Sequence, residues 1–338
     1  MLSHAFYTFQ RVSDLHSSIC EIKDLRKCFA VRGGVLGLQI VSQLRAVDGV
    51  SLNILKGETL GLVGESGCGK TTLSRCILGI LPPTSGEVQF MGHNILNLKG
   101  EKLRNVRRQI GAIFQDPFTS MTPTMTVEDI VGEPLMINHL ASKYERRKIV
   151  QEMLENVGLS STNISRYPHE FSGGQRQRIA IARALVSRPK FLVADEPVAA
   201  LDVSIRAEVL NLMVQLQKDL GITSLFISHD LSVVRYISDR VAVMYLGKIV
   251  EIAQTEELFE ATQHPYTKAL ISAIPIPDPT VKKDRIILSG EVPTPLNPPS
   301  GCPFHTRCFQ KEQACEKEEP ELIEVGENHF VSCLKLAS

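Results

Sequence analysis

Short apolar runs alternate along the chain with longer amphipathic segments. Residues 59–63 form a brief apolar run that ends at a glycine-rich turn, and similar runs occur at 191–194 and 223–228. Runs of this length are typical of strands buried on both faces. Helical periodicity occupies 71–81, where two prolines stop it, and 204–220. This alternation predicts an α/β fold with a mostly parallel sheet.

The remaining segments predict how the chain is divided. Residues 116–166 are polar and helical, with helices expected near 126–135 and 144–157. Residues 241–252 are typical of a hairpin, and proline clusters follow it at 275–279 and 293–299. We therefore expect an N-terminal tail at 1–20, a main domain at 21–270 with a helical subdomain at about 116–170, and a separate extension at 271–338.

Composition narrows the class of protein. The 338 residues include 37 Lys and Arg and 37 Asp and Glu, so zero formal net charge gives the whole chain no attraction to nucleic acid. No stretch approaches the roughly 18 apolar residues of a transmembrane helix. Residues 1–18 lack the basic start and apolar core of a secretory signal. These features predict a cytosolic chain, where disulfides rarely persist.

A glycine-rich motif follows the first predicted strand. It matches G-x-x-x-x-G-K-[ST] and consists of Gly64, Glu65, Ser66, Gly67, Cys68, Gly69, Lys70 and Thr71. Its glycines let successive backbone N–H groups point at phosphate oxygens, and the next helix directs its positive end at the anion. Lys70 can reach the β- and γ-phosphates, and the Thr71 hydroxyl can bind Mg²⁺. The alternative is an accidental glycine-rich turn, but the strand–loop–helix context favours a nucleotide site.

Two further segments carry acidic or anion-binding chemistry. Asp195 and Glu196 end an apolar strand, where Asp195 suits Mg²⁺ and Glu196 can act as the general base toward water. Alone, such a pair can simply be acids at a strand end. Ser172 can cap a helix that begins with Gly173 and Gly174, whose bare N–H groups would form a second anion site. The alternative there is an ordinary capped helix.

The motifs also follow one another in a fixed order. Gln115 lies in Phe-Gln-Asp, Asp202 ends Ala-Ala-Leu-Asp, and His229 lies in Ser-His-Asp. With the phosphate loop, the Ser172 turn and the acidic pair, this order resembles the ATP-binding-cassette (ABC) ATPase family over about residues 21–270. The resemblance implies a P-loop NTPase fold of the ABC-ATPase type, with a mostly parallel sheet, an antiparallel β subdomain and a helical insertion.

The resemblance further implies that two subunits sandwich ATP and Mg²⁺. One subunit would grip the nucleotide through Gly64, Glu65, Ser66, Gly67, Cys68, Gly69, Lys70, Thr71 and Thr72. The second would contact the γ-phosphate through Ser172, Gly173, Gly174 and Gln175. Mg²⁺ would be held by Thr71, Gln115 and Asp195, and the catalytic residues would be Glu196, His229, Gln115 and Lys70.

Phe29 and Asp202 complete the set of residues that the resemblance assigns. Phe29 would stack on adenine, where relatives often carry Tyr, although core packing is the alternative. Asp202 would connect the two sites across the dimer. His229 has the alternative of a structural histidine at a strand end. Phe171 stands where Leu is usual and Ala199 where Ser is common. Because the acid, base and switch positions are intact, we expect an active ATPase.

The C-terminal region narrows the resemblance. Residues 264–270, 290–302 and 304–308 are similar to the extension of ATPases from oligopeptide and dipeptide importers, most like the second ATPase of the pair. This resemblance implies a different ABC ATPase as a heterodimer partner, two membrane-spanning permease subunits and an extracytoplasmic solute-binding protein. It places the chain at the cytoplasmic face of the membrane. Nickel or other small-solute importers share the extension, and a soluble ABC switch acting on DNA or ribosomes is an alternative from another class.

Four of the eight cysteines crowd the end of the chain. They are Cys302, Cys308, Cys315 and Cys333. Four thiolates can close a metal or cluster site, but these intervals match neither zinc ribbons nor common ferredoxins. The resemblance to peptide-importer ATPases implies an iron–sulfur cluster of the [4Fe–4S] type. Zinc and four reduced thiols are the alternatives.

Overall fold

The computed structural model of the chain describes residues 18–33, 39–116, 121–275 and 284–336. The predicted tail lies outside these residues up to position 17, and the first proline cluster lies outside them from position 276. The chain divides into two compact units.

The first unit consists of residues up to Leu55, Leu60–Gly92 and the chain from Ser228 onward. Its strands are β1 (Ser18–Gly33), β2 (Gln39–Leu55), β3 (Thr59–Val63, whose first residue belongs to the second unit), β4 (Ser85–Phe90), β9 (Arg240–Tyr245), β10 (Lys248–Gln254), β11 (Ile323–Gly326) and β12 (His329–Val331). Its helices are α2 (Lys70–Ile77), α9 (Leu231–Ile237), α10 (Thr255–Glu260) and α11 (Pro265–Ser272), with 3₁₀ turns at Gln313–Glu316 and Leu334–Leu336.

One sheet of this unit contains the strand that leads into the phosphate loop. β3 runs parallel to β9, and β9 pairs antiparallel with β10, which confirms the hairpin predicted at 241–252. Every residue of β3 and β9 is buried. This burial explains why these strands have apolar runs rather than alternating patterns. β10 then pairs with β12, and β12 with β11.

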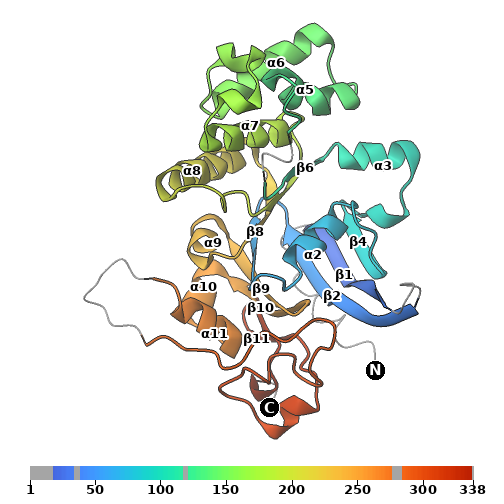
Figure 1. The fold of residues 1–338 in the computed structure, drawn as a ribbon, viewed down its shortest axis with the longest axis vertical. Helices are drawn as coiled ribbons and strands as arrows, with labels where there is room; N and C mark the ends of the chain where they lie inside the picture. Colours follow the sequence, from blue (N-terminus) through green and yellow to red (C-terminus); the bar gives the residue numbers. More distant parts are fainter. Residues whose placement is uncertain (1–17, 34–38, 117–120, 276–283, 337–338) are drawn as a thin grey trace. The chain divides into compact units, whose positions relative to one another are not determined.

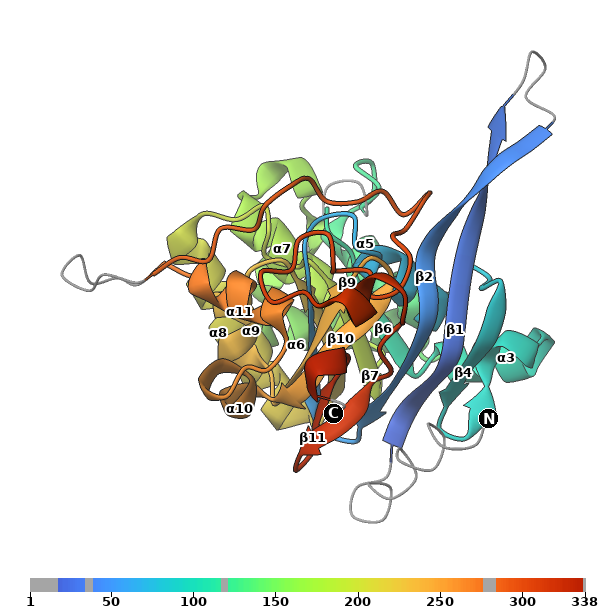
Figure 2. The ribbon, with the colours of Figure 1, turned by 90° about the horizontal axis from the view of Figure 1, so that it is seen from below.

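The other sheet contains the long antiparallel pair of β1 and β2, with β4 on the far side of β1 (Figure 2). Several bulges interrupt the register of β1 and β2, and bulges bend and twist a strand pair. The second proline cluster lies against β2, because the Arg45 N–H donates to the Pro295 carbonyl at 3.1 Å. The extension therefore contacts the β2 side of this sheet.

A buried carboxylate joins the extension to β10. Glu251 is fully buried, and its Oε1 accepts from His329 Nε2 on β12 at 2.8 Å and from the Gln263 N–H at 2.8 Å. Its Oε2 accepts from the His264 N–H at 3.2 Å. His329 is 2% exposed, and its Nδ1 lies 3.6 Å from Glu257 Oε1. Polar contacts therefore reinforce the short pairing of β10 with β12.

The second unit consists of Lys56–Thr59 and His93–Ile227. Its strands are β5 (His93–Asn94), β6 (Ile110–Ile113), β7 (Phe191–Asp195) and β8 (Thr223–Ser228, whose last residue belongs to the first unit). Its helices are α3 (Gly100–Arg107), α5 (Val127–Ile137), α6 (Lys143–Asn156), α7 (Gly173–Leu185) and α8 (Val203–Leu220), with 3₁₀ turns at Ile95–Asn97, Ser161–Ser165 and Pro168–Glu170.

The second unit has a parallel sheet and a group of helices. β6, β7 and β8 pair in parallel, in that order. The apolar runs predicted β7 and β8, whereas β6 was not predicted. Within the helical group α5, α6 and α7 pack on one another, and α7 also contacts α8 (Figure 1, green to yellow). The predicted helices at 126–135, 144–157 and 204–220 correspond to α5, α6 and α8.

One predicted helix is shorter than its periodicity suggested. α2 ends at Ile77 rather than at residue 81, well before the two prolines. Gly79 adopts φ 64 and its N–H donates to the Cys76 carbonyl at 3.0 Å. A glycine in this left-handed conformation ends a helix, so glycine rather than proline sets the boundary. Within the described ranges, no helix combines the length and apolar character needed to cross a bilayer.

Candidate functional site

The phosphate loop begins after β3 and ends at the N-terminus of α2. Gly69 is the N-cap of α2 with φ 111, and a Cβ there would overlap the Ala46 carbonyl oxygen. A Cβ on Gly64 would overlap the Met244 carbonyl oxygen. Both positions therefore require glycine, because the backbone turns against neighbouring strands with no room for a side chain.

Lys70 is folded over this loop. Its side chain is buried, and its Nζ donates to the Gly64 carbonyl at 2.7 Å and to the Glu65 carbonyl at 3.1 Å. The ammonium group is thus held at the loop where a phosphate would bind. Cys68 is also buried, and its burial raises the pKa of the thiol although the nearby Lys70 charge lowers it. Ser66 and Gly67 are exposed.

The first turn of α2 presents hydroxyl groups beside the lysine. Thr71 and Thr72 directly follow Lys70, and both are half-buried. A threonine hydroxyl is an oxygen donor of the kind Mg²⁺ prefers, as are the Gln115 amide oxygen and the Asp195 carboxylate. The donor set expected for Mg²⁺ therefore fits the ion in its chemistry. Thr71 belongs to the first unit, whereas Gln115 and Asp195 belong to the second.

The expected acid and base lie at the end of β7 in the second unit. Asp195 is buried, and Glu196 follows with φ 50, a left-handed conformation that is uncommon outside glycine. The Glu196 N–H donates to the Ile227 carbonyl of β8 at 3.0 Å. Gln115 Nε2 donates to Glu196 Oε2 at 3.4 Å. Two residues that are 81 positions apart in the sequence are thereby brought together, as an attacking water would require.

The Ser172 turn forms a capping box at the start of α7. Ser172 Oγ accepts from the Gln175 N–H at 3.3 Å, and the Ser172 N–H donates to Gln175 Oε1 at 3.0 Å. The two glycines differ in their surroundings. A Cβ on Gly174 would overlap Ile205 of α8, whereas a Cβ on Gly173 would have nothing within 4 Å. Packing explains Gly174, while Ser172, Gly173 and Gln175 are exposed and available to a second molecule.

The other expected site residues lie at the surface. Phe29 on β1 is 39% exposed, with Lys27 Nζ 5.1 Å from its ring centre. An exposed ring suits stacking better than core packing. Asp202 is the N-cap of α8 without a side-chain capping bond, and exposed His229 directly follows β8. Phe171, in contrast, is buried beneath the Arg166 guanidinium, 4.7 Å from its ring centre.

Two residues that contact the phosphate loop were not expected from the sequence. Arg307 of the extension donates two hydrogen bonds to the Glu65 carboxylate, and the Tyr266 hydroxyl accepts from the Glu65 N–H at 2.9 Å. Arg307 lies inside the segment 304–308 that carries the resemblance to peptide importers. No local pattern links it to a loop 242 positions earlier.

The four C-terminal cysteines surround one small cavity of about 10 Å³. All four are free thiols, and burial raises the pKa of Cys302 to about 11. A cavity of this size holds about one water molecule, which is too small for a cluster of four irons and four sulfides. No group of three or more His, Cys, Asp or Glu in the described part of the chain is arranged to hold a metal ion. The expected iron–sulfur cluster is therefore not supported, although the thiols converge.

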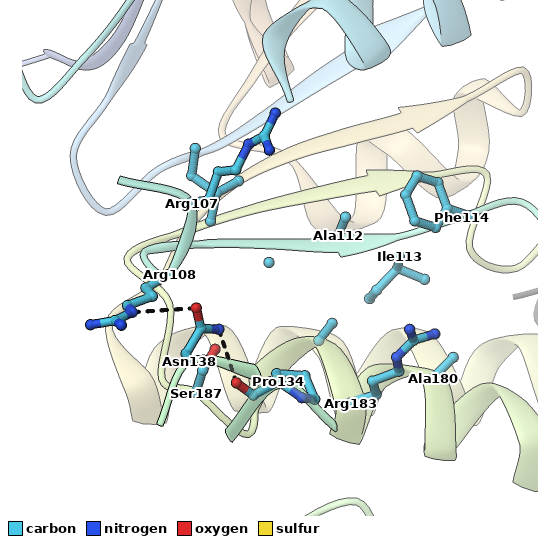
Figure 3. A pocket seen from close by; sticks show the side chains of 13 residues that line it. Arg107, Arg108, Ala112, Ile113, Phe114, Pro134, Asn138, Ala180, Arg183 and Ser187 are labelled. Atoms are coloured by element: carbon cyan, nitrogen blue, oxygen red, sulfur yellow. Dashed lines mark hydrogen bonds between the residues drawn. The ribbon is translucent and has the colours of Figure 1, made fainter. Parts of the chain in front are cut away.

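A larger pocket of about 220 Å³ lies within the second unit (Figure 3). β6, α5 and α7 contribute to its lining, and Phe114, next to Gln115, lies at the edge where β6 ends. At the end of the pocket away from Phe114, Arg108 Nε donates to Asn138 Oδ1 at 3.3 Å (Figure 3). Arg183 of α7 donates to Glu133 of α5 at 2.6 Å, which links the two helices beside the pocket.

Comparisons with known proteins agree with this geometry. Residues 47–199 match the ABC transporter family, and residues 250–315 match the family described as oligopeptide/dipeptide transporter, C-terminal region. The chain is 51% identical to the oligopeptide transport ATP-binding protein AppF of Bacillus subtilis, over 94% of this chain and 97% of that protein. It is 50% identical to the oligopeptide transport ATP-binding protein OppF of Escherichia coli, over 96% and 98% respectively.

A solved structure is similar in fold. The dimeric ATP-binding cassette MJ0796, in a post-hydrolysis state bound to ADP and Pi, superposes with a TM-score of 0.62 and 30% identity, over 70% of this chain and 98% of that one. This likeness confirms the ABC-ATPase fold class. The chain therefore belongs to the ATP-binding proteins of the ABC transporter family that carry the oligopeptide/dipeptide transporter C-terminal region, and it is an ATPase that uses ATP and Mg²⁺.

Proposed function

We propose that the chain is the ATP-hydrolysing subunit of an importer for oligopeptides or dipeptides. The observation that carries this proposal is the identity of about half of all residues to oligopeptide transport ATP-binding proteins, which extends through the C-terminal extension. Two groups of residues, which we call half-sites, support ATP hydrolysis. One is Lys70 folded over the phosphate loop in the first unit, and the other is the pair of Gln115 and Glu196 in the second unit.

The residues of these half-sites suit hydrolysis of the γ-phosphate. Lys70 would exchange its two carbonyl partners for phosphate oxygens, and Mg²⁺, held by Thr71, Gln115 and Asp195, would neutralise charge on them. Glu196 would take the proton from the attacking water as the new bond to phosphorus forms and ADP leaves. Gln115 and His229 would orient this water.

The exposed Ser172 turn would complete the site of a second ATPase subunit. Backbone N–H groups at the start of α7 and the positive end of the helix favour an anion. We propose a different ABC ATPase as this partner, because the extension resembles that of the second ATPase of a pair. ATP between the subunits would favour the closed dimer, and hydrolysis would release it.

The pocket between β6, α5 and α7 is where we propose that the membrane subunits are contacted. It lies next to Gln115, so a helix seated there could report on the Gln115 and Glu196 pair. The chain would accordingly sit peripherally at the cytoplasmic face of the membrane, with two permease subunits and an extracytoplasmic solute-binding protein.

Glu196→Gln tests the proposed chemistry in the assembled importer. We expect ATP hydrolysis and peptide import to fall by roughly 10²–10⁴ while nucleotide binding is kept, because only the general base is lost. Glu155→Gln removes an exposed carboxylate of α6 and is the matched control. Undiminished hydrolysis in Glu196→Gln would contradict the role of the base.

Solute and partners are tested separately. Binding and uptake of labelled peptides, compared with nickel, distinguish the two importer classes. Purification with two multi-span proteins supports transport, whereas purification with ribosomes or DNA would support the soluble switch and contradict the importer.

For the four cysteines, the resemblance to peptide-importer ATPases supports a [4Fe–4S] cluster, whereas the small cavity supports four reduced thiols. Metal and sulfide analysis of anaerobically purified protein distinguishes the alternatives. Four irons and four sulfides per chain would support the cluster, zinc alone would support a zinc site, and no metal would support the reduced thiols.

A further inference from the structure

Every polar group of Glu65 in the phosphate loop has a hydrogen-bond partner. Two of these partner residues, Arg307 and Tyr266, come from the C-terminal part of the first unit. Arg307 Nη1 donates to Oε2 at 2.8 Å and Nη2 to Oε1 at 3.1 Å, a bidentate pair. The Glu65 N–H donates to the Tyr266 hydroxyl, and the Glu65 carbonyl accepts from Lys70. The same residue thus touches the catalytic lysine on one side and the extension on the other.

Arg307 is held rigidly enough to position this carboxylate. Its side chain is 8% exposed, compared with 27% for that of Glu65. The Glu65 hydrogen bonds raise the pKa of the guanidinium, so Arg307 stays charged. Planar bidentate pairs fix geometry more strictly than single hydrogen bonds do.

Aromatic packing anchors the turn that carries Arg307. Phe304 is almost fully buried, and its ring lies edge-on to Tyr245, with ring centres 5.2 Å apart. The same ring lies 5.4 Å from that of Tyr266. Phe304 therefore holds both the arginine turn and the tyrosine that accepts from Glu65.

This turn is also part of the four-cysteine module. The His305 N–H donates to the Cys302 carbonyl at 3.0 Å, and the Cys302 N–H donates to the Cys315 carbonyl at 2.9 Å. Cys308 directly follows Arg307. A change in the module that moves Cys302 or Cys308 must therefore move the arginine between them.

We propose that Arg307 is a positioning residue for the phosphate loop, through which the folded state of the four-cysteine module sets the affinity of the site for MgATP. The proposal concerns regulation of the nucleotide site and rests on that part of the proposed function. It does not depend on which solute is transported. Arg307 acts through Glu65 and the loop, not through contact with the nucleotide.

The test measures MgATP affinity of the purified full-length chain and its ATP turnover in the assembled importer. We expect Arg307→Met and Glu65→Gln each to raise the Kd and KM for MgATP about 10-fold, with kcat changed less, because the bidentate contact orders the loop before binding. The double variant should be no worse than either single variant, since both remove one interaction. Arg307→Lys, which keeps the charge but loses the fork, should recover only part of the affinity.

The control is Arg285→Met, which removes an exposed arginine of the same extension. Unchanged MgATP affinity in Arg307→Met with only a lower Tm would overturn the proposal, as would additive effects in the double variant. If Arg307→Met does not fold, Glu65→Gln removes the same ion pair from the other side. Wild-type MgATP affinity in Glu65→Gln would also overturn the proposal. Failure of the wild-type chain to bind MgATP would instead count against the nucleotide site itself.

Discussion

His329→Leu should loosen the attachment of β12 to β10. The change removes the imidazole that donates to Glu251 at 2.8 Å, and it leaves a fully buried carboxylate without that partner. Breaking a buried ion pair from one side costs about 3–5 kcal/mol. We expect about 3 kcal/mol, near the lower end of that range, because the Gln263 and His264 N–H groups still donate to the carboxylate.

Hydrogen exchange measures this effect where it occurs. The amides of β12 should exchange about 100-fold faster in His329→Leu, since each 1.4 kcal/mol corresponds to about a tenfold change in the opening equilibrium. Adding Glu251→Gln should restore part of the protection, because no charge is then left buried. Glu327→Gln, in the exposed turn of the same hairpin, is the control and should change exchange little. Less than a threefold acceleration in His329→Leu would refute the reasoning.

The pH dependence of the same junction has a definite sign. Burial alone would lower the pKa of His329, but the hydrogen bonds and charges of Glu251 and Glu257 outweigh it and raise the pKa above its usual value. The stabilisation is therefore complete below the unfolded pKa of about 6.5 and is lost as pH rises through the raised pKa in the folded protein. Protection of the β12 amides should fall on the alkaline side, and a fall confined to acidic pH would contradict this assignment.

Other predictions concern single residues. Burial lowers the pKa of His264 to about 4, and the Nδ1 of the neutral imidazole caps α11. The contribution of this cap to stability is therefore present above about pH 6.5 and should be lost as pH falls toward 4. Hydrogen exchange of the α11 amides during acid titration measures this loss. Gly69→Ala should abolish MgATP binding, measured by calorimetry, because a Cβ would overlap Ala46; retained affinity would show that the loop can shift. Phe304→Ala should lower stability by about 4 kcal/mol in urea unfolding and also weaken MgATP binding. Unchanged MgATP binding would show that the extension does not influence the phosphate loop. Ser172→Ala should lower stability by about 1 kcal/mol, because a helix cap is lost, yet it should slow ATP hydrolysis more than 10-fold. A loss of stability without slower hydrolysis would show that Ser172 acts only as a helix cap.

Local patterns predicted the parts of the site that depend on neighbouring residues. The phosphate loop is contiguous, so its glycines, Lys70 and flanking strand could be located from spacing alone. Ser172 as a helix cap followed in the same way, because a capping box spans only four consecutive residues. The pattern could not distinguish Gly174, which packs on Ile205, from Gly173, which does not.

Contacts between distant segments lay beyond such reasoning. Arg307 and Glu65 are 242 positions apart, and His329 and Glu251 are 78 apart. In the sequence each is an ordinary polar residue. The pairing of β10 with β12 brings His329 to Glu251, and the fold of the extension brings Arg307 to the phosphate loop. The shorter α2 has a related cause, since helical periodicity continues past Ile77 but the left-handed backbone of Gly79 ends the helix.

The contact between Arg45 and Pro295 bears on how the chain avoids aggregation. A long strand with free N–H groups is a template for intermolecular β-pairing. Because proline has no N–H, the segment around Pro295 can accept from the strand without offering a further ladder of donors to other molecules. A chain truncated before this segment would leave the Arg45 N–H without this acceptor, and we expect it to aggregate more readily at the concentrations reached during overproduction.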